Sequence, residues 1–235
     1  MSSISIIITA LLPIAILALY IYRKDKKSPE PIGQLVKAFI YGVLSIPLSL
    51  CISTPLEMVG VYSSEAETVL GSIRLSFFGA AIPEETAKLF MLWMLLRKNR
   101  YFDEKMDGIV YAVCVSLGFA ALENVMYLFV NAESYLTVGF SRAIFAIPGH
   151  FCFGILMGYY YSLASFYPKS SSRNKMLVLL APIIVHGIYD SILFISSVTP
   201  YVSGLLTIVF LVFCYKMWKY GSARIGELLQ RDSVY

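Results

Sequence analysis

Long apolar stretches follow one another along almost the whole chain, separated by short polar segments. Each is close to the roughly 20 residues that a helix needs to cross a membrane. Helices are expected because they satisfy their own backbone in lipid, and no stretch shows the alternation of a barrel strand. The pattern predicts an all-α, polytopic membrane protein, with residues 1–235 forming one integral-membrane domain. Its seven predicted spans are 4–22, 33–53, 73–96, 108–130, 142–165, 176–198 and 203–219.

Charged residues are few and gather at the ends of these stretches. They make up 14% of the chain, whereas soluble domains carry about 25%. If the segment after the first span is cytoplasmic, most of the 19 lysines and arginines fall on the cytoplasmic side, as the positive-inside rule requires. The N-terminus is then predicted outside and the C-terminus inside. The net charge of +4 is spread over these short clusters, so no nucleic-acid partner is expected.

The first apolar stretch is predicted to be a retained span and not a cleaved signal peptide. Residues 1–12 lack a basic start, and no small-residue cleavage site follows the run. The four cysteines lie in separate spans without CxxC spacing, which predicts buried thiols and no disulfide framework. The glycines at 154 and 158 have the GxxxG spacing that lets two membrane helices approach closely.

Ionisable residues stand inside several of the predicted spans. Burying a carboxylate or an imidazole at bilayer depth is unfavourable, so such residues usually mark a functional site. Prolines at 83, 148 and 182 stand close by and can open a small polar cavity by bending their helices. The candidate site residues are Glu84 and Glu85 in the third span, Glu123 in the fourth, His150 in the fifth, and His186 with Asp190 in the sixth.

Spacing and helical rise predict that these residues meet. Lys88 follows Glu84 by four positions and Glu85 by three, and Asp190 follows His186 by four, so each set shares a helix face. With a rise of about 1.5 Å per residue, all the candidates fall in one thin layer, at mid-depth or about 4–6 Å outward. Four spans therefore direct acidic and imidazole groups to one level of the bilayer.

Several chemistries fit such a layer. A carboxylate can take a proton from water and return it to a leaving amine, which suits hydrolysis. Two histidines and a carboxylate can hold zinc, although no HExxH motif is present. A proton-coupled transporter or channel could use the same groups as a relay, but it needs polar residues along its full depth. A non-catalytic scaffold leaves the buried glutamates without a purpose.

Four segments together resemble the PrsW family of intramembrane proteases, which is related to the CaaX-protease and bacteriocin-processing superfamily. They read PEETAKLF, DGIVYAVCVSLGFAALENVMY, RAIFAIPGH and HGIYDSILF, and the early RKDKKSPEPIGQL segment is similar as well. The resemblance covers about residues 20–195. It implies a glutamate- and histidine-dependent metallopeptidase in the bacterial plasma membrane. The implied catalytic or ligand positions are Glu84, Glu85, Glu123, His150 and His186, with Asp190 as the orienting carboxylate.

The resemblance also sets expectations for cofactor and substrate. A divalent metal, zinc first, would be held by Glu123, His150 and His186. Glu85 is expected to activate water, with Glu84 supporting it beside Lys88. The substrate is expected to be a single-pass membrane protein, such as an anti-sigma factor in regulated intramembrane proteolysis, cut near the extracytoplasmic membrane border.

Overall fold

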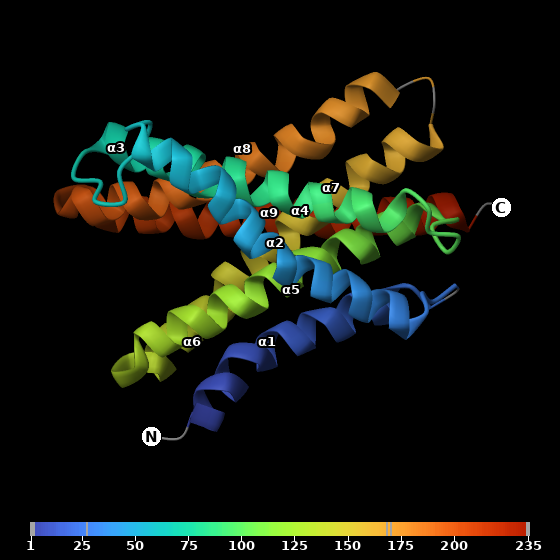
Figure 1. Cartoon of the computed structure of the whole chain (residues 1–235), viewed down its shortest axis with the longest axis horizontal. Helices are drawn as coiled ribbons and strands as arrows, with labels where there is room; N and C mark the ends of the chain where they lie inside the picture. The colour runs from blue at the N-terminus through green and yellow to red at the C-terminus, as the bar shows by residue number, and fades with distance from the viewer. Residues whose placement is uncertain (1–2, 27, 168, 170, 234–235) are drawn as a thin grey trace.

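The chain folds into a bundle of long helices joined by short loops (Figure 1). A computed structural model describes residues 3–26, 28–167, 169 and 171–233, and this part of the chain contains no strand. The all-α prediction is thereby confirmed. The elements are α1 (Ser3–Lys24), α2 (Ile32–Met58), α3 (Val69–Arg74), η1 (Leu75–Ala81), α4 (Ile82–Leu96), α5 (Lys105–Val130), η2 (Ala132–Ser134), α6 (Tyr135–Ile144), α7 (Ala146–Phe166), α8 (Ser171–Val198), η4 (Pro200–Val202) and α9 (Ser203–Asp232).

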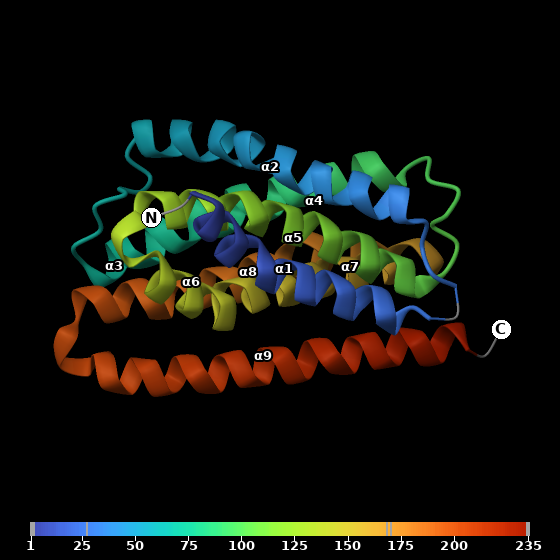
Figure 2. The same cartoon turned by 90° about the horizontal axis from the view of Figure 1, so that it is seen from below.

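Six helical stretches in the described chain are individually long and apolar enough to cross a membrane, which confirms a multi-pass architecture. They correspond to α1, α2, α5, α6 with α7, α8, and α9. The predicted span 73–96 is a composite of α3, η1 and α4 and would be the seventh. Helix α1 begins at one end of the bundle and α9 ends at the other (Figures 1 and 2), as an odd number of crossings requires. Seven spans and the orientation of the termini stay predictions.

The composite rod differs from the uninterrupted helix expected over 73–96. Its central segment η1 is a π-helix. Pro83 is the second residue of the following helix α4 and lacks the N–H that would continue the α-helical bonding to residue 79. Wider turns of this kind are often found at functional sites. The ring of Phe77 in η1 fills the place that a side chain at Gly187 would occupy, so η1 packs tightly on α8 beside His186.

Two other predicted spans have different bounds in the structure. The span expected over 142–165 is broken at Phe145, where α6 ends and α7 begins. The last span was expected to end at residue 219, but α9 continues as a helix to Asp232. Its extension packs Ile225 and Leu228 into the core. Average hydropathy does not predict this extension, because only one face of the helix is apolar there.

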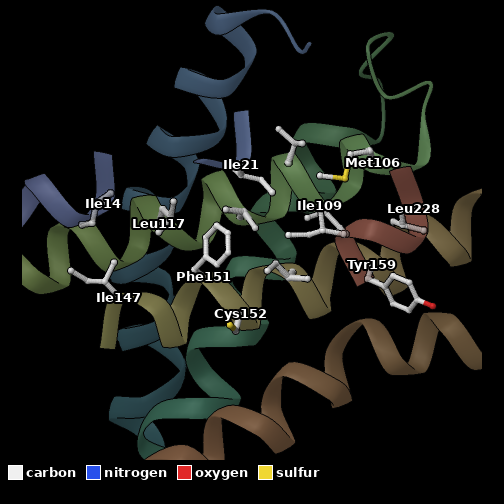
Figure 3. Close-up of a cluster of buried hydrophobic side chains, with 14 of the residues drawn as sticks. Ile14, Ile21, Met106, Ile109, Leu117, Ile147, Phe151, Cys152, Tyr159 and Leu228 are labelled. Atoms are coloured by element: carbon white, nitrogen blue, oxygen red, sulfur yellow. The ribbon is translucent and has the colours of Figure 1, made fainter. Parts of the chain in front are cut away.

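Helices α5 and α7 form the centre of the bundle. Almost every residue of α5 from Met106 to Ala121 is buried, and α7 packs along it more extensively than any other helix. Gly158 of α7 lies directly on the backbone of Gly108, where a side chain would clash, so the close contact predicted from the GxxxG spacing is present. Figure 2 shows α2 and α9 on opposite sides of this centre. Figure 3 shows side chains from α1, α5, α7 and α9 meeting in one apolar cluster.

Candidate active site

Lys88 is the centre of a buried polar network in the membrane-spanning part of the bundle. Its ammonium group lies 2.8 Å from Glu85 Oε1 and 3.3 Å from Glu84 Oε2, on the same turn of α4. It also lies 3.2 Å from Nδ1 of His150 on α7, and 4.1 Å from the centre of the Phe119 ring. An ammonium group has three N–H donors, and these three acceptors use all of them. This count assigns Nδ1 of His150 as an acceptor and places the imidazole proton on Nε2.

Glu123 holds the other side of His150. Its Oε2 lies 3.0 Å from His150 Nε2, which donates to it. The same oxygen accepts from Arg142 Nη2 at 2.6 Å, and Arg142 Nε donates to Asn124 Oδ1 at 2.6 Å. The guanidinium also stacks over the Tyr127 ring at 4.1 Å. Arg142 stands on the short helix α6 and therefore ties α6 to the face of α5 that carries Glu123 and Asn124.

His186 lies between two carboxylates. Its Nδ1 is 2.9 Å from Glu85 Oε1, and its Nε2 is 3.2 Å from Asp190 Oδ2 one turn along α8. The ring stacks on Phe153 at 4.5 Å, with an angle of 17° between the planes. The predicted i,i+4 pairing of His186 with Asp190 is therefore present. Both ring nitrogens already face oxygen acceptors, which fixes the orientation of the imidazole.

A cavity of about 170 Å³ adjoins this network and has room for a few water molecules. Glu84 borders the cavity and keeps 14% of its side chain exposed, whereas Glu85 is 0% exposed and does not reach it. Glu85 Oε2 has no hydrogen-bond partner within the described chain. The cavity lining includes Glu84, Glu123, Tyr127, Arg142, His150, Phe153, His186, Tyr189 and Asp190.

All six residues singled out from the sequence belong to this one network. Lys88 connects Glu84, Glu85 and His150; His150 connects to Glu123; and Glu85 leads through His186 to Asp190. The convergence expected from depth alone is therefore found. Their catalytic roles stay predictions. The four carboxylates outnumber the cationic groups, which are Lys88, Arg142 and, because both of its nitrogens face carboxylate oxygens, a doubly protonated His186. The cluster therefore still favours additional positive charge.

A metal fits this donor set in two ways. One carboxylate oxygen each from Glu84 and Glu123 and one nitrogen of His150 lie within 4.8 Å of one another. Catalytic zinc sites commonly have three protein ligands of these types and leave a position open, as the adjoining cavity would allow. The corresponding atoms of Glu84, Glu85 and His186 form a second such group, also within 4.8 Å of one another. The predicted ligand set of Glu123, His150 and His186 therefore stays a prediction, with Glu84 as a further candidate ligand.

Two features of the network were missed from the sequence. Arg142 was not among the candidate site residues, yet it binds Glu123 directly. Lys88 was paired only with its neighbours on α4, yet it also reaches His150. The sequence did contain a signal for Arg142. Glu123 is a carboxylate within a predicted span with no cation on its own helix face, so its partner had to come from another helix.

Comparison with known proteins gives consistent matches over most of the chain. The model of the family described as "PrsW family intramembrane metalloprotease" matches residues 30–217. A protein named Protease PrsW from Oceanobacillus iheyensis is 35% identical over 91% of this chain and 94% of its own length. The protein of that name from Clostridioides difficile is 33% identical over 95% of this chain and 91% of its own length. The Bacillus subtilis protein is 31% identical over 96% and 99%, respectively. No solved structure matches the chain.

Proposed function

This chain belongs to the PrsW family of intramembrane metalloproteases, and from that premise we propose that its buried cavity hydrolyses a peptide bond of a membrane-anchored protein. The observation that carries the proposal is the cavity bordered by Glu84, Glu123 and His150 between α4, α5 and α7. Membership of the family makes the chain a multi-pass membrane protease, and its relatives are bacterial. It therefore favours hydrolysis over the proton-coupled transport that the sequence left open.

We assign the proton transfer to Glu84 in place of Glu85. Glu84 faces the cavity, and a general base has to reach the water that it deprotonates. The carboxylate takes one proton from water while the water oxygen bonds to the peptide carbonyl carbon. When the C–N bond breaks, Glu84 returns that proton to the leaving amine. Lys88, 3.3 Å away, holds the carboxylate in place throughout.

The other residues position the reacting groups. Glu85 fixes Lys88 and His186 from behind the cavity, and Asp190 fixes the second nitrogen of His186. Arg142 uses two of its five N–H donors on Asn124 and Glu123. Arg142 lines the cavity, so its remaining donors can stabilise the oxyanion that forms on the carbonyl. A divalent ion held by Glu123 and His150 beside Glu84, most simply zinc, would polarise the carbonyl and acidify water when bound.

Removal of divalent metal is expected to abolish cleavage. Purified protein dialysed against EDTA should lose activity and regain it on addition of Zn²⁺, because two carboxylates and an imidazole form a zinc-type donor set. Metal content and cleavage rate are measured on the same samples. Full activity in protein whose metal content has fallen far below one ion per chain would contradict the metal assignment.

The proposed substrate is a single-pass membrane protein, and an anti-sigma factor is the proposed example. The span boundaries inferred from the charge distribution would place the cavity at mid-depth or slightly toward the extracytoplasmic side. The test is co-reconstitution in liposomes with a single-pass anti-sigma factor tagged at both ends. The expected result is one new fragment, with the cut mapped by mass spectrometry near the extracytoplasmic border. Cleavage only within a soluble domain of the substrate would contradict the proposal.

A further inference from the structure

A second group of carboxylates, two of them buried and one half-buried, lies far from the catalytic cavity. Asp25 stands in the linker after α1, and Glu104 and Asp107 stand at the start of α5. One carboxylate oxygen from each lies within 4.8 Å of the other two. Asp107 precedes Glu123 by sixteen residues on α5, which corresponds to about 24 Å along the helix. The group is therefore separate from the active site and lies at the end of the bundle where α1 finishes and α5 begins, as Ile21 and Met106 illustrate in Figure 3.

Two oxygens of this group are buried without a partner. Asp25 is 2% exposed and Asp107 is 0% exposed. Oδ2 of Asp25 and Oδ1 of Asp107 have no hydrogen-bond donor within the described chain. A buried carboxylate oxygen without a donor or a cation is strongly unfavourable. These two atoms therefore point to a ligand that the protein itself does not supply.

Helix capping explains some of these carboxylate oxygens but not the two without partners. Asp107 Oδ2 accepts from the backbone N–H groups of Asp103 and Glu104 at 3.0 and 2.6 Å. Glu104 accepts from the backbone of Asp107 in the reciprocal capping arrangement. Asp232 of α9 accepts from the N–H groups of Lys105 and Met106. The first turn of α5 is thus capped without Asp107 Oδ1 or any oxygen of Asp25.

The charges around the group are also unbalanced. In the described residues, no lysine or arginine forms an ion pair with Asp25, Asp107 or the nearby Glu30, which is 4% exposed. Tyr111 donates its hydroxyl hydrogen to Glu30. A cluster of this kind is stabilised by bound positive charge.

We propose that Asp25, Glu104 and Asp107 bind a divalent cation that fastens the α1–α2 linker to the start of α5. The donors are all carboxylate oxygens, which hard cations such as Mg²⁺, Ca²⁺ and Mn²⁺ prefer and which give no selectivity for zinc. The cation would fix the first turn of the same helix that carries Glu123. This site acts on the fold of the protease and takes no part in the peptide hydrolysis.

The test measures Mn²⁺ binding to the purified full-length protein by electron paramagnetic resonance, after EDTA treatment and desalting. Asp25→Asn keeps the size of the side chain and removes its charge. Glu104→Gln is a second variant that preserves the capping acceptor. Asp103→Asn is the matched control, because Asp103 is an exposed neighbour outside the group. Any ion bound at the catalytic cavity is common to all four proteins and cancels in the comparison.

The proposal predicts that Asp25→Asn and Glu104→Gln each bind one Mn²⁺ fewer than the parent, while Asp103→Asn binds the parental number. With Mn²⁺ at about 100-fold above its dissociation constant, the thermal midpoint of the parent should rise about 5–10 °C further than that of Asp25→Asn. Mg²⁺ or Ca²⁺ should displace the ion. Equal Mn²⁺ binding by the parent and both variants, or displacement by Zn²⁺ alone, would overturn the proposal.

Discussion

Glu84→Gln is expected to lower the cleavage rate about 10²–10⁴-fold, the usual contribution of a general acid–base residue. The amide keeps an oxygen that can accept from Lys88, but it can no longer take a proton from water. The protein should stay folded because the 3.3 Å contact with Lys88 is the only hydrogen bond or ion pair of the Glu84 side chain among the described residues, and the amide oxygen can keep it. The measurement is the initial rate on a reconstituted substrate, at equal amounts of protein with unchanged thermal midpoints.

Two further variants make this result specific. Glu67→Gln applies the same chemical change to an exposed residue between α2 and α3 and should leave the rate unchanged. Glu85→Gln removes a fully buried charge that holds both Lys88 and His186, so it should lower the thermal midpoint as well as the rate. If Glu84→Gln retained the parental rate while Glu85→Gln lost activity at an unchanged midpoint, the base would be Glu85.

Lys88→Met is expected to give the largest loss of stability among single changes in the network. It leaves Glu84, Glu85 and His150 without the cation that joins them. Breaking a buried ion pair from one side costs about 3–5 kcal/mol, because the remaining charge stays buried and uncompensated. The free energy of unfolding is measured in mixed detergent micelles. Lys98→Met, an exposed change at the end of the same helix, is the control and should stay near the parent.

The same network predicts how a second change should act. Adding Glu85→Gln to Lys88→Met removes the carboxylate that the first change leaves without its cation. The double variant should therefore lose less stability than the two single variants lose together. Changes to residues in one ion-pair network do not have additive effects on the free energy of unfolding. Strict additivity would show that Lys88 and Glu85 do not depend on each other.

The depth of the site residues was predictable from the sequence, whereas the direction of each side chain was not. Helical rise gives depth directly, and this placed all six candidates at one level. Neighbouring residues on a helix point about 100° apart, so Glu84 and Glu85 share a depth but only Glu84 faces the cavity. The rotation of α4 depends on how η1 and the surrounding helices pack, which hydropathy does not record.

Hydropathy also did not identify the residues near the ends of spans that make buried contacts with other helices. Arg142 lies at one end of a predicted span and Asp25 follows the first span, and neither was among the candidate site residues. The structure instead places Arg142 on Glu123 and buries Asp25 against the start of α5. Similarly, α9 extends beyond its apolar part because Ile225 and Leu228 pack inward. These contacts are long-range, so no local pattern specifies them.

Hydrolysis in water enriched in ¹⁸O, followed by mass spectrometry of the reconstituted substrate, tests the central claim most directly. The parent protein should produce a fragment cut near the extracytoplasmic border whose new C-terminal carboxylate carries ¹⁸O, because the attacking oxygen comes from water in the cavity. Glu84→Gln should yield at most a hundredth as much of this fragment in the same time. The same amount of labelled fragment from parent and Glu84→Gln would contradict the account.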